Sequence, residues 1–424
     1  MTVSEIKELL SSSSYDEKLK SLYVTEDVKT QKLRILHIMD GFTEAFAERD
    51  ITIFSAPGRT ELGGNHTDHQ HGKVLAASVN LDIIACAAKN ESNVIRIISE
   101  GYPMDEIDLS VMSPQENEIN HTAALIRGIV HIVKEMGYEI SGFDAYMTSN
   151  VLGGSGLSSS AAYETMIGVI VNTFFCDGQL TAVDIAKNGQ YAENVFFGKP
   201  CGLMDQMASS VGNVVAIDFA DEEEPVIEEI KFPFTQCGHS LCIVDSGADH
   251  ADLTDEYAAV PSEMKEVAKF FGKTVLHEVS ENDFWENIAG IRKACGDRAV
   301  LRAGHFFEES KRAAEEAEAL KVNDFQRFLK LVKESGRSSF MYLQNVYPSG
   351  YTSQQAVAVS LFLAEKLLKG KGAVRVHGGG FAGTIQAFVP NDMLNEFKDG
   401  MEKVLGEDSC HVLGIRPAGG IVLM

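Results

Sequence analysis

The sequence predicts an α+β protein with two lobes, each built around an antiparallel sheet. Its 424 residues suit two to three domains or one large two-lobed unit, and 45% of them are hydrophobic, enough for a sizeable core. Strand and helix patterns do not alternate regularly enough for a parallel, doubly wound sheet. The acidic run at 220–225 is the expected boundary, which divides the chain into lobes of 1–220 and 221–424.

Each element follows from local periodicity and from glycine or proline punctuation. The first lobe is expected to hold, in order, helices within 3–49, strands at 51–58, 73–90, 94–100 and 143–151, helices from 158 and over 181–197, and a strand at 213–219. The second lobe is expected to hold a strand at 239–247, helices over 254–271 and 284–343, two strands joined by a glycine turn within 373–390, a helix at 392–405 and a final strand within 414–424.

The composition of the chain argues against several kinds of binding partner. The net charge of −24 repels phosphate backbones and anionic lipid, so neither nucleic acid nor a membrane is expected as a partner. No apolar run approaches the ~20 residues of a membrane span, and the start of the chain lacks the pattern of a signal peptide. The seven cysteines are scattered and form no C-x-x-C pair, which argues against a disulfide framework and a zinc cage. A cytoplasmic, reduced protein is expected.

The segment VLGGSGLSSSAAYETMIG, residues 151–168, has the character of an anion-binding loop. Gly153, Gly154 and Gly156 allow positive φ and close backbone approach, and the serines at 158–160 open a predicted helix. A capped turn is the simpler alternative, because serine is a favoured N-cap. The run LSSSSYDEK at 10–18 has no glycine, and we assign it only that capping role.

Two further glycine-rich segments are candidates for ligand binding. APGRTELGGNHTDHQHG, residues 56–72, places many hydrogen-bonding side chains in an expected loop, as a site for a polyhydroxylated ligand would. His66, Asp68, His69 and His71 also imitate a zinc ligand set, but their order, H-x-D-H-x-H, is not that of the metallo-β-lactamases, so a sugar or phosphate site is preferred. HGGGFAGT, residues 377–384, is a glycine turn between strands and is a weak signal alone.

Together and in this order, the segments resemble the motifs of the GHMP small-molecule kinases, and most closely those of galactokinases. The first motif of that family, Gly-Arg-Val-Asn-Leu-Ile-Gly-Glu-His-x-Asp-Tyr, stands here as GRTELGGNHTDH (58–69). The phosphate-loop ending Gly-Leu-Ser-Ser-Ser-Ala is unchanged at 156–161. CGLMDQ (201–206) resembles Cys-Gly-Ile-Met-Asp-Gln, and GGGFAG (378–383) resembles the third motif. The resemblance covers nearly the whole chain.

The resemblance implies the GHMP-kinase fold, with a ribosomal-protein-S5-like N-terminal lobe, a ferredoxin-like C-terminal lobe and the site in the cleft. It implies transfer of the γ-phosphoryl group of ATP to a sugar hydroxyl, the anomeric one in galactokinases, with Mg²⁺. Asp205 matches the base, and Arg59 matches the arginine that stabilises developing charge. The remaining roles match as follows: sugar binding at Asn65, His66, Asp68, Gly202 and Tyr257; ATP binding at Gly154, Gly156, Leu157, Ser158, Ser159, Ser160, Gly379 and Gly380; magnesium at Ser160 and Glu193.

Departures from the motif concern the sugar. Asn65 replaces the glutamate that contacts the C6 hydroxyl in galactokinases, Glu61 replaces asparagine, His69 replaces tyrosine and His71 replaces glycine. An amide at 65 suits galactose and also the carboxylate of galacturonate. We therefore expect a galactokinase, with a galacturonokinase or related sugar-1-kinase as the alternative, and expect Asn65→Glu to spare galactose phosphorylation. A non-catalytic sugar and ATP sensor is the alternative from a different class.

Overall fold

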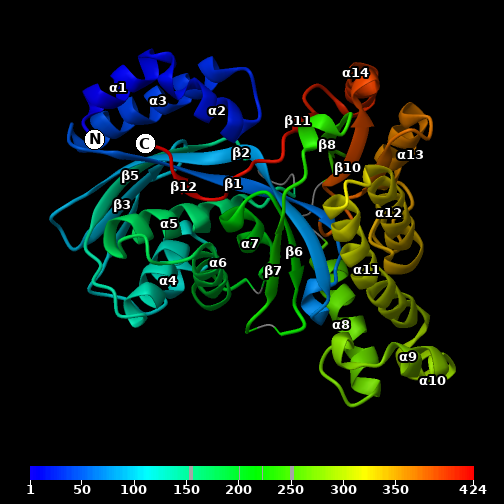
Figure 1. Ribbon diagram of the computed structural model, residues 1–424. Helices are drawn as coiled ribbons and strands as arrows, with labels where there is room; N and C mark the ends of the chain where they lie inside the picture. Colours follow the sequence, from blue (N-terminus) through cyan, green and yellow to red (C-terminus); the bar gives the residue numbers. More distant parts are fainter. Residues whose placement is uncertain (152–155, 200, 222, 249–252) are drawn as a thin grey trace.

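The computed structural model confirms two α+β lobes (Figure 1). It describes residues 1–151, 156–199, 201–221, 223–248 and 253–424. Within these residues the larger sheet has eight strands in the order β12-β1-β2-β5-β3-β4, with β6 and β7 added beside β2. The smaller sheet has four strands in the order β11-β8-β10-β9. The pairing is antiparallel except that β3 and β5 are parallel, so one pair departs from the expected antiparallel sheets.

The larger sheet is covered by helices on both faces (Figure 1). Alternate residues of its central strands point to opposite sides, as strand geometry requires. Ile53 and Ile84 pack with helices α1 to α3, whereas Phe54 and Ala85 pack with α4 and α5. The elements of this lobe are α1 Val3–Ser11, α2 Asp16–Tyr23, α3 Val28–Phe46, β1 Thr52–Gly63, β2 Lys73–Lys89, β3 Val94–Ser99, β4 Asp105–Asp108, α4 Thr122–Glu135, β5 Phe143–Ser149, α5 Ser159–Phe175, α6 Ala182–Tyr191, a π-helical turn Ala192–Phe197, α7 Met204–Val211, β6 Val214–Asp218 and β7 Val226–Ile230.

The smaller sheet lies between α12 and the pair α13–α14. Phe328 of α12 packs on Phe388, and Val357 of α13 packs with Val389 and Phe397 on the other face. Helices α8 to α10 pack along α11 and extend this lobe (Figure 1). Its elements are β8 His239–Asp245, α8 Thr254–Phe270, α9 Glu281–Glu286, α10 Ile288–Cys295, α11 Asp297–Lys321, α12 Phe325–Ser338, a π-helical turn Ser339–Leu343, α13 Ala356–Leu368, β9 Ala373–Val376, β10 Thr384–Pro390, α14 Leu394–Leu405, β11 Cys410–Leu413 and β12 Ile421–Val422.

The chain passes more than once between the lobes. Strand β7 lies after the expected boundary near 220 but pairs with β6 of the larger sheet. Strand β12, at the end of the chain, returns to pair with β1. The two lobes are therefore joined along several chain segments.

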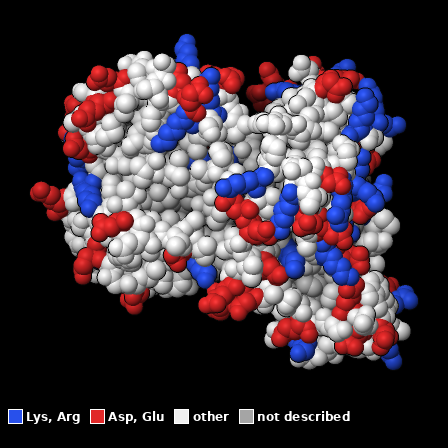
Figure 2. Space-filling view, in the orientation of Figure 1, with Lys and Arg blue, Asp and Glu red and all other residues white. Residues whose placement is uncertain are grey.

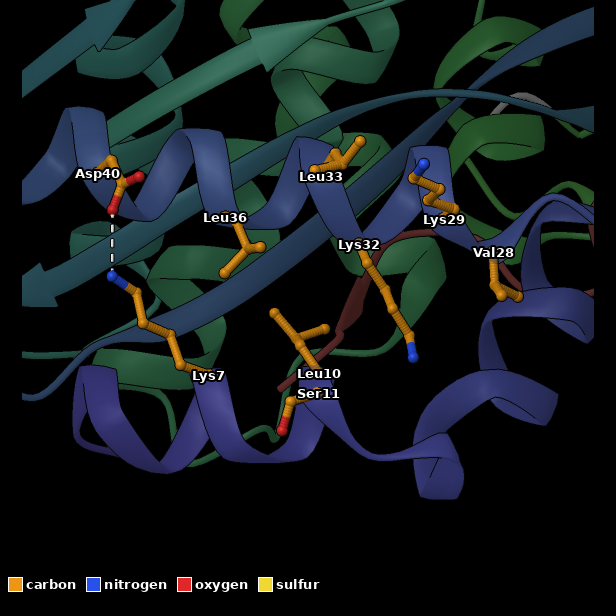
Figure 3. Close-up of a pocket in the computed structure, with 9 residues that line it drawn as sticks. All are labelled: Lys7, Leu10, Ser11, Val28, Lys29, Lys32, Leu33, Leu36 and Asp40. Carbon is orange, nitrogen blue, oxygen red and sulfur yellow. Dashed lines mark hydrogen bonds and ion pairs between the residues drawn. The ribbon is translucent and has the colours of Figure 1, made fainter.

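A cavity of about 660 Å³ lies between α1 and α3, lined by four apolar side chains together with Lys7, Lys29, Lys32, Ser11 and Asp40 (Figure 3). Lys7 and Asp40 form an ion pair of 3.3 Å across it. Helices α1 and α3 cover the face of the larger sheet opposite to α5, the helix that follows the phosphate loop. The cavity is thus separated from the sequence motifs by the sheet.

The surface mixes charges of both signs. Figure 2 shows small groups of Asp and Glu side chains beside Lys and Arg over both lobes. Among the helices of the described residues, none is long and apolar enough to cross a membrane.

Candidate active site

Arg59 and Asp205 form the centre of the site. Arg59 lies on β1, and Asp205 lies in the first turn of α7. The Arg59 Nε donates to Asp205 Oδ1 at 2.6 Å, and Nη2 donates to Oδ2 at 2.6 Å, a bidentate ion pair. Planar guanidinium and carboxylate groups match in this way, so the pair fixes the orientation of both side chains.

The electrostatics keep Asp205 ionised. Burial would raise its pKa, but the charge and hydrogen bonds of Arg59 and a hydrogen bond from Ser158 outweigh burial, so the pKa lies below its ordinary value. The Asp205 side chain keeps 31% of its surface accessible, whereas Arg59 keeps 8%. The carboxylate can therefore meet a ligand while the guanidinium remains enclosed by protein.

The phosphate loop is attached to this pair. The Arg59 Nη1 donates to the carbonyl of Gly156, and the Arg59 backbone N–H donates to the carbonyl of Leu157 at 3.0 Å. Ser158 Oγ donates to Asp205. The Leu157 side chain is fully buried in the core of the larger lobe, so it anchors the loop. Gly154 lies outside the described residues.

The end of the loop shapes the start of α5. Gly156 and Ser158 have φ of 73° and 52°. The positive φ is costly for a serine, and such strain is concentrated at functional positions. Ser159 is exposed and Ser160 is partly exposed in the first helical turn. The first N–H groups of a helix have no intrahelical acceptors, so this end of α5 can receive an anion.

Glu193 is a buried carboxylate near the same helix. Gln206 Nε2 donates to Glu193 Oε2 and to Glu164 Oε2, both at 2.9 Å. Glu164 lies one helical turn after Ser160, so the Gln206 amide links the Ser160 face of α5 to Glu193. The second Glu193 oxygen faces the Lys199 ammonium at 3.3 Å.

Ser160 and Glu193 carry the kinds of oxygen atom that a magnesium ion prefers, and a metal site here stays a prediction. Mg²⁺ prefers oxygen ligands and usually takes one or two from protein, with phosphates and water completing its shell. Ser160 offers a hydroxyl and Glu193 a buried carboxylate, one oxygen of which pairs with the Lys199 ammonium. Within the residues that the structure describes, no three His, Cys, Asp or Glu side chains are grouped as a metal site of their own.

Asp68 and Gly202 lie together beside Asp205. A Cβ atom on Gly202 would lie 2.4 Å from Asp68 Oδ2, so a larger residue there would force the Asp68 carboxylate to move. Burial raises the pKa of Asp68 to about 6, and the nearby Asp205 charge adds to the shift. Asp68 is thus a second carboxylate of the site, with a protonation state that changes at mildly acidic pH.

His66 and Tyr257 contact the glycine turn. His66 Nε2 donates to the Gly379 carbonyl at 3.0 Å, and burial lowers the His66 pKa to about 4, so the ring is neutral near pH 7. Tyr257 donates to the Gly380 carbonyl at 2.6 Å. A Cβ atom on Gly379 would lie 2.7 Å from the Tyr257 ring. Close packing therefore explains this glycine, and a role of the turn in ATP binding stays a prediction.

The Asn65 side chain is enclosed by protein groups. Its side chain is fully buried, and Nδ2 donates to Glu61 Oε1 at 3.1 Å and to the Gly378 carbonyl at 2.7 Å. Its Oδ1 accepts from Asn345 at 2.9 Å and from Ser339 at 3.2 Å. Both amide hydrogens and the oxygen are engaged by protein groups. In this conformation Asn65 has no amide hydrogen left for a sugar.

Sequence reasoning missed four polar residues around the site: Glu164, Lys199, Gln206 and Arg375. Lys199 and Gln206 flank Asp205 in the segment GKPCGLMDQ, and that proximity was the available signal. Arg375 forms an ion pair with Glu61 and donates to the Leu62 carbonyl at 3.0 Å. No local pattern marks Arg375, because its partners lie in the other lobe.

Comparison with known proteins identifies the family of the chain. The galactokinase galactose-binding signature matches residues 40–89, and the N-terminal domain of GHMP kinases matches residues 124–213. The chain is 33% identical over 361 residues to a galactokinase of Actinobacillus pleuropneumoniae, covering 84% of this chain and 90% of the relative. It is 31% identical over 379 residues to a galactokinase of Haemophilus influenzae, covering 87% and 91%.

The chain belongs to the galactokinase family of the GHMP kinases. Members of this family are sugar kinases, so the protein is a phosphotransferase that acts on a sugar hydroxyl. The fold agrees. The crystal structure of Lactococcus lactis galactokinase complexed with galactose has a TM-score of 0.76 at 24% identity, covering 90% of this chain and 98% of that one. A mevalonate kinase structure has a TM-score of 0.57 at 16% identity, covering 85% and 99%.

Proposed function

We propose that this galactokinase-family enzyme transfers the γ-phosphoryl group of ATP to the anomeric hydroxyl of galactose, with Mg²⁺, in the cytoplasm. The observation that carries the proposal is the Arg59–Asp205 pair, which hydrogen-bonds to the phosphate loop through Gly156 and Ser158. In this proposal the pair would supply a proton acceptor and a positive charge beside the first turn of α5, which would bind the phosphates. Galactose is proposed because the curated relatives are galactokinases.

The phosphates of ATP would bind at the start of α5. Its first turn, Ser159 and Ser160, would donate to the phosphates of ATP, and its dipole favours their negative charge. Phosphoryl transfer passes through a loose transition state, so catalysis depends on positioning and on compensation of charge. Arg59 supplies a permanent charge within reach of the same loop, because its Nη1 binds the Gly156 carbonyl.

Asp205 would orient the attacking hydroxyl and take its proton. Its low pKa makes it a weak base, which suits a late proton transfer, after bond formation to phosphorus has made the hydroxyl acidic. Asp68, packed against Gly202, would accept a hydrogen bond from another sugar hydroxyl. Ser160 and Glu193 would hold Mg²⁺, which compensates the negative charge of the phosphates when bound.

The test is ADP release by the purified protein with ATP, Mg²⁺ and a panel of galactose, galacturonate and arabinose. We expect the largest kcat/KM with galactose. A preference for galacturonate would establish the alternative kinase. Binding of sugar and ATP without turnover on any sugar would contradict the proposal and establish a sensor.

A further inference from the structure

Asn65 lies in the segment 56–72, called the sugar segment below, and joins it to the other lobe through contacts with several elements. Besides its side-chain contacts, its backbone carbonyl accepts from His305 Nε2 of α11 at 2.9 Å. Its Oδ1 accepts hydrogen bonds from Asn345 and Ser339, which follow α12. Its amide nitrogen donates to the Gly378 carbonyl. A residue that bound sugar would present its polar atoms to the cleft. Asn65 presents them to protein.

Two neighbouring residues of the sugar segment donate hydrogen bonds to two successive carbonyls of the glycine turn. Asn65 donates to the carbonyl of Gly378, and His66 donates to that of Gly379. Asn345, which binds the Asn65 side chain, also donates to the Gly379 carbonyl at 3.2 Å. The Asn65 amide is thus one of the contacts that hold the turn against the first motif.

Glu61 makes this arrangement of Asn65 possible. When the Asn65 amide nitrogen donates to Gly378, its second hydrogen also needs an acceptor. Glu61 Oε1 accepts this hydrogen bond at 3.1 Å. Arg375 compensates the buried Glu61 charge. The related kinase motif has asparagine at the first position and glutamate at the second, so this chain carries the two groups in exchanged places and in direct contact.

We propose that Asn65 and Glu61 form one interdependent positioning unit, which fixes the glycine turn to the sugar segment and so couples the sugar subsite to the nucleotide subsite. The inference rests on the proposed function for the identity of the two ligands. It assigns Asn65 no contact with the sugar. Asn65→Glu is accordingly expected to impair the enzyme on galactose, because it brings a second carboxylate against Glu61.

The test interchanges amide and carboxylate groups at positions 65 and 61 while keeping the shape of each side chain. Asn65→Asp places an acceptor oxygen against Glu61 and the Gly378 carbonyl, and we expect KM for sugar and KM for ATP to rise together, each about tenfold or more. Glu61→Gln leaves Arg375 without its carboxylate, and we expect a similar loss. In the double variant one amide again faces one carboxylate. We expect both KM values to recover most of the way, incompletely because Gly378 still lacks its donor.

The control is Asn90→Asp. Asn90 Nδ2 donates at 2.8 Å to Asp144, a buried carboxylate paired with Arg96 and Arg49, so the same substitution meets the same kind of partner far from the motifs. We expect Asn90→Asp to lower Tm and leave both KM values unchanged. If Asn65→Asp lowers Tm and otherwise behaves like the control, Asn65 is only structural and the proposal fails.

Two further outcomes decide the proposal. If Asn65→Asp raises the KM for sugar alone, and adding Glu61→Gln does not restore it, Asn65 is a sugar ligand and the proposal is overturned. Calorimetric titration of ADP with and without galactose provides a readout that does not need turnover. If galactose tightens ADP binding to the parent and this effect is lost in Asn65→Asp, the coupling is supported even if the parent phosphorylates another sugar. Equal ADP affinities of the parent with and without galactose would contradict the coupling.

Discussion

Replacing Asp205 by asparagine removes one charge from the site and keeps the size of the side chain. The Arg59 guanidinium donates to both Asp205 oxygens at 2.6 Å. In Asp205→Asn, one of these oxygens becomes an NH₂ group, so at least one donor of Arg59 or Ser158 loses its acceptor. The variant also lacks the carboxylate that is proposed to take the proton from the sugar.

The expected loss follows from these two changes. A positioned general base contributes roughly 10²- to 10⁴-fold, which corresponds to about 2.7–5.4 kcal/mol of activation free energy. Breaking a fully buried ion pair costs roughly 3–5 kcal/mol of stability. Because 31% of the Asp205 side chain is accessible, water can replace part of the lost contact, and the stability loss should be smaller. We therefore expect a folded variant with at least a hundredfold lower kcat.

The assay is the initial rate of ADP release at saturating galactose and ATP, together with calorimetric Kd values for both ligands. The matched control is Asp144→Asn. Asp144 is also paired with two arginines, Arg49 and Arg96, but it lies at the end of β5 away from the phosphate loop. We expect the control to lower Tm and keep kcat. Turnover of Asp205→Asn within a few-fold of the parent would refute the assignment of the base.

Three further predictions concern the metal, the pH dependence and the fit of the sugar. Glu193→Gln and Ser160→Ala should each raise the Mg²⁺ concentration needed for half-maximal rate, and unchanged magnesium titrations would remove both from the metal site. Because the Asp68 pKa is raised to about 6, acidification through pH 6 protonates it, so sugar KM should rise as pH falls, a step that Asp68→Asn should abolish. Gly202→Ala should raise sugar KM but not ATP KM, because its Cβ would lie 2.4 Å from Asp68; equal effects on both substrates would contradict this reading.

Much of the fold could be predicted because most elements carry a local signal. The start of α5 and the strand at β6 follow from helical spacing and from alternation. The segment 56–72 was expected to be a loop, and that was wrong for its first part, because β1 continues to Gly63 and pairs with β2. Arg59 and Glu61 therefore lie on a strand. Glycine and charged residues are poor strand formers, so tertiary pairing overrode the local preference.

The site could be predicted only in part, for a related reason. The glycine-serine pattern alone brought Ser158 to attention, whereas Asp205 and Gly202 were found only through the resemblance to the kinase motifs. The structure places these three residues near Arg59 or Asp68. The surroundings of Asn65 carry no such signal, since Asn345, Ser339 and Gly378 are remote in the chain. A polar side chain in a motif can serve the ligand or the protein, and only the position of its partners distinguishes the two.

The most direct test of the central claim is to identify the product. The purified protein is incubated with ATP, Mg²⁺ and galactose, and the reaction is followed by ³¹P and ¹H NMR, with Asp205→Asn in parallel. We expect a phosphate ester at the anomeric carbon that accumulates in step with ADP in the parent and is strongly reduced in the variant. ADP with free phosphate, an ester at another hydroxyl, or equal ester formation by both proteins would contradict the claim.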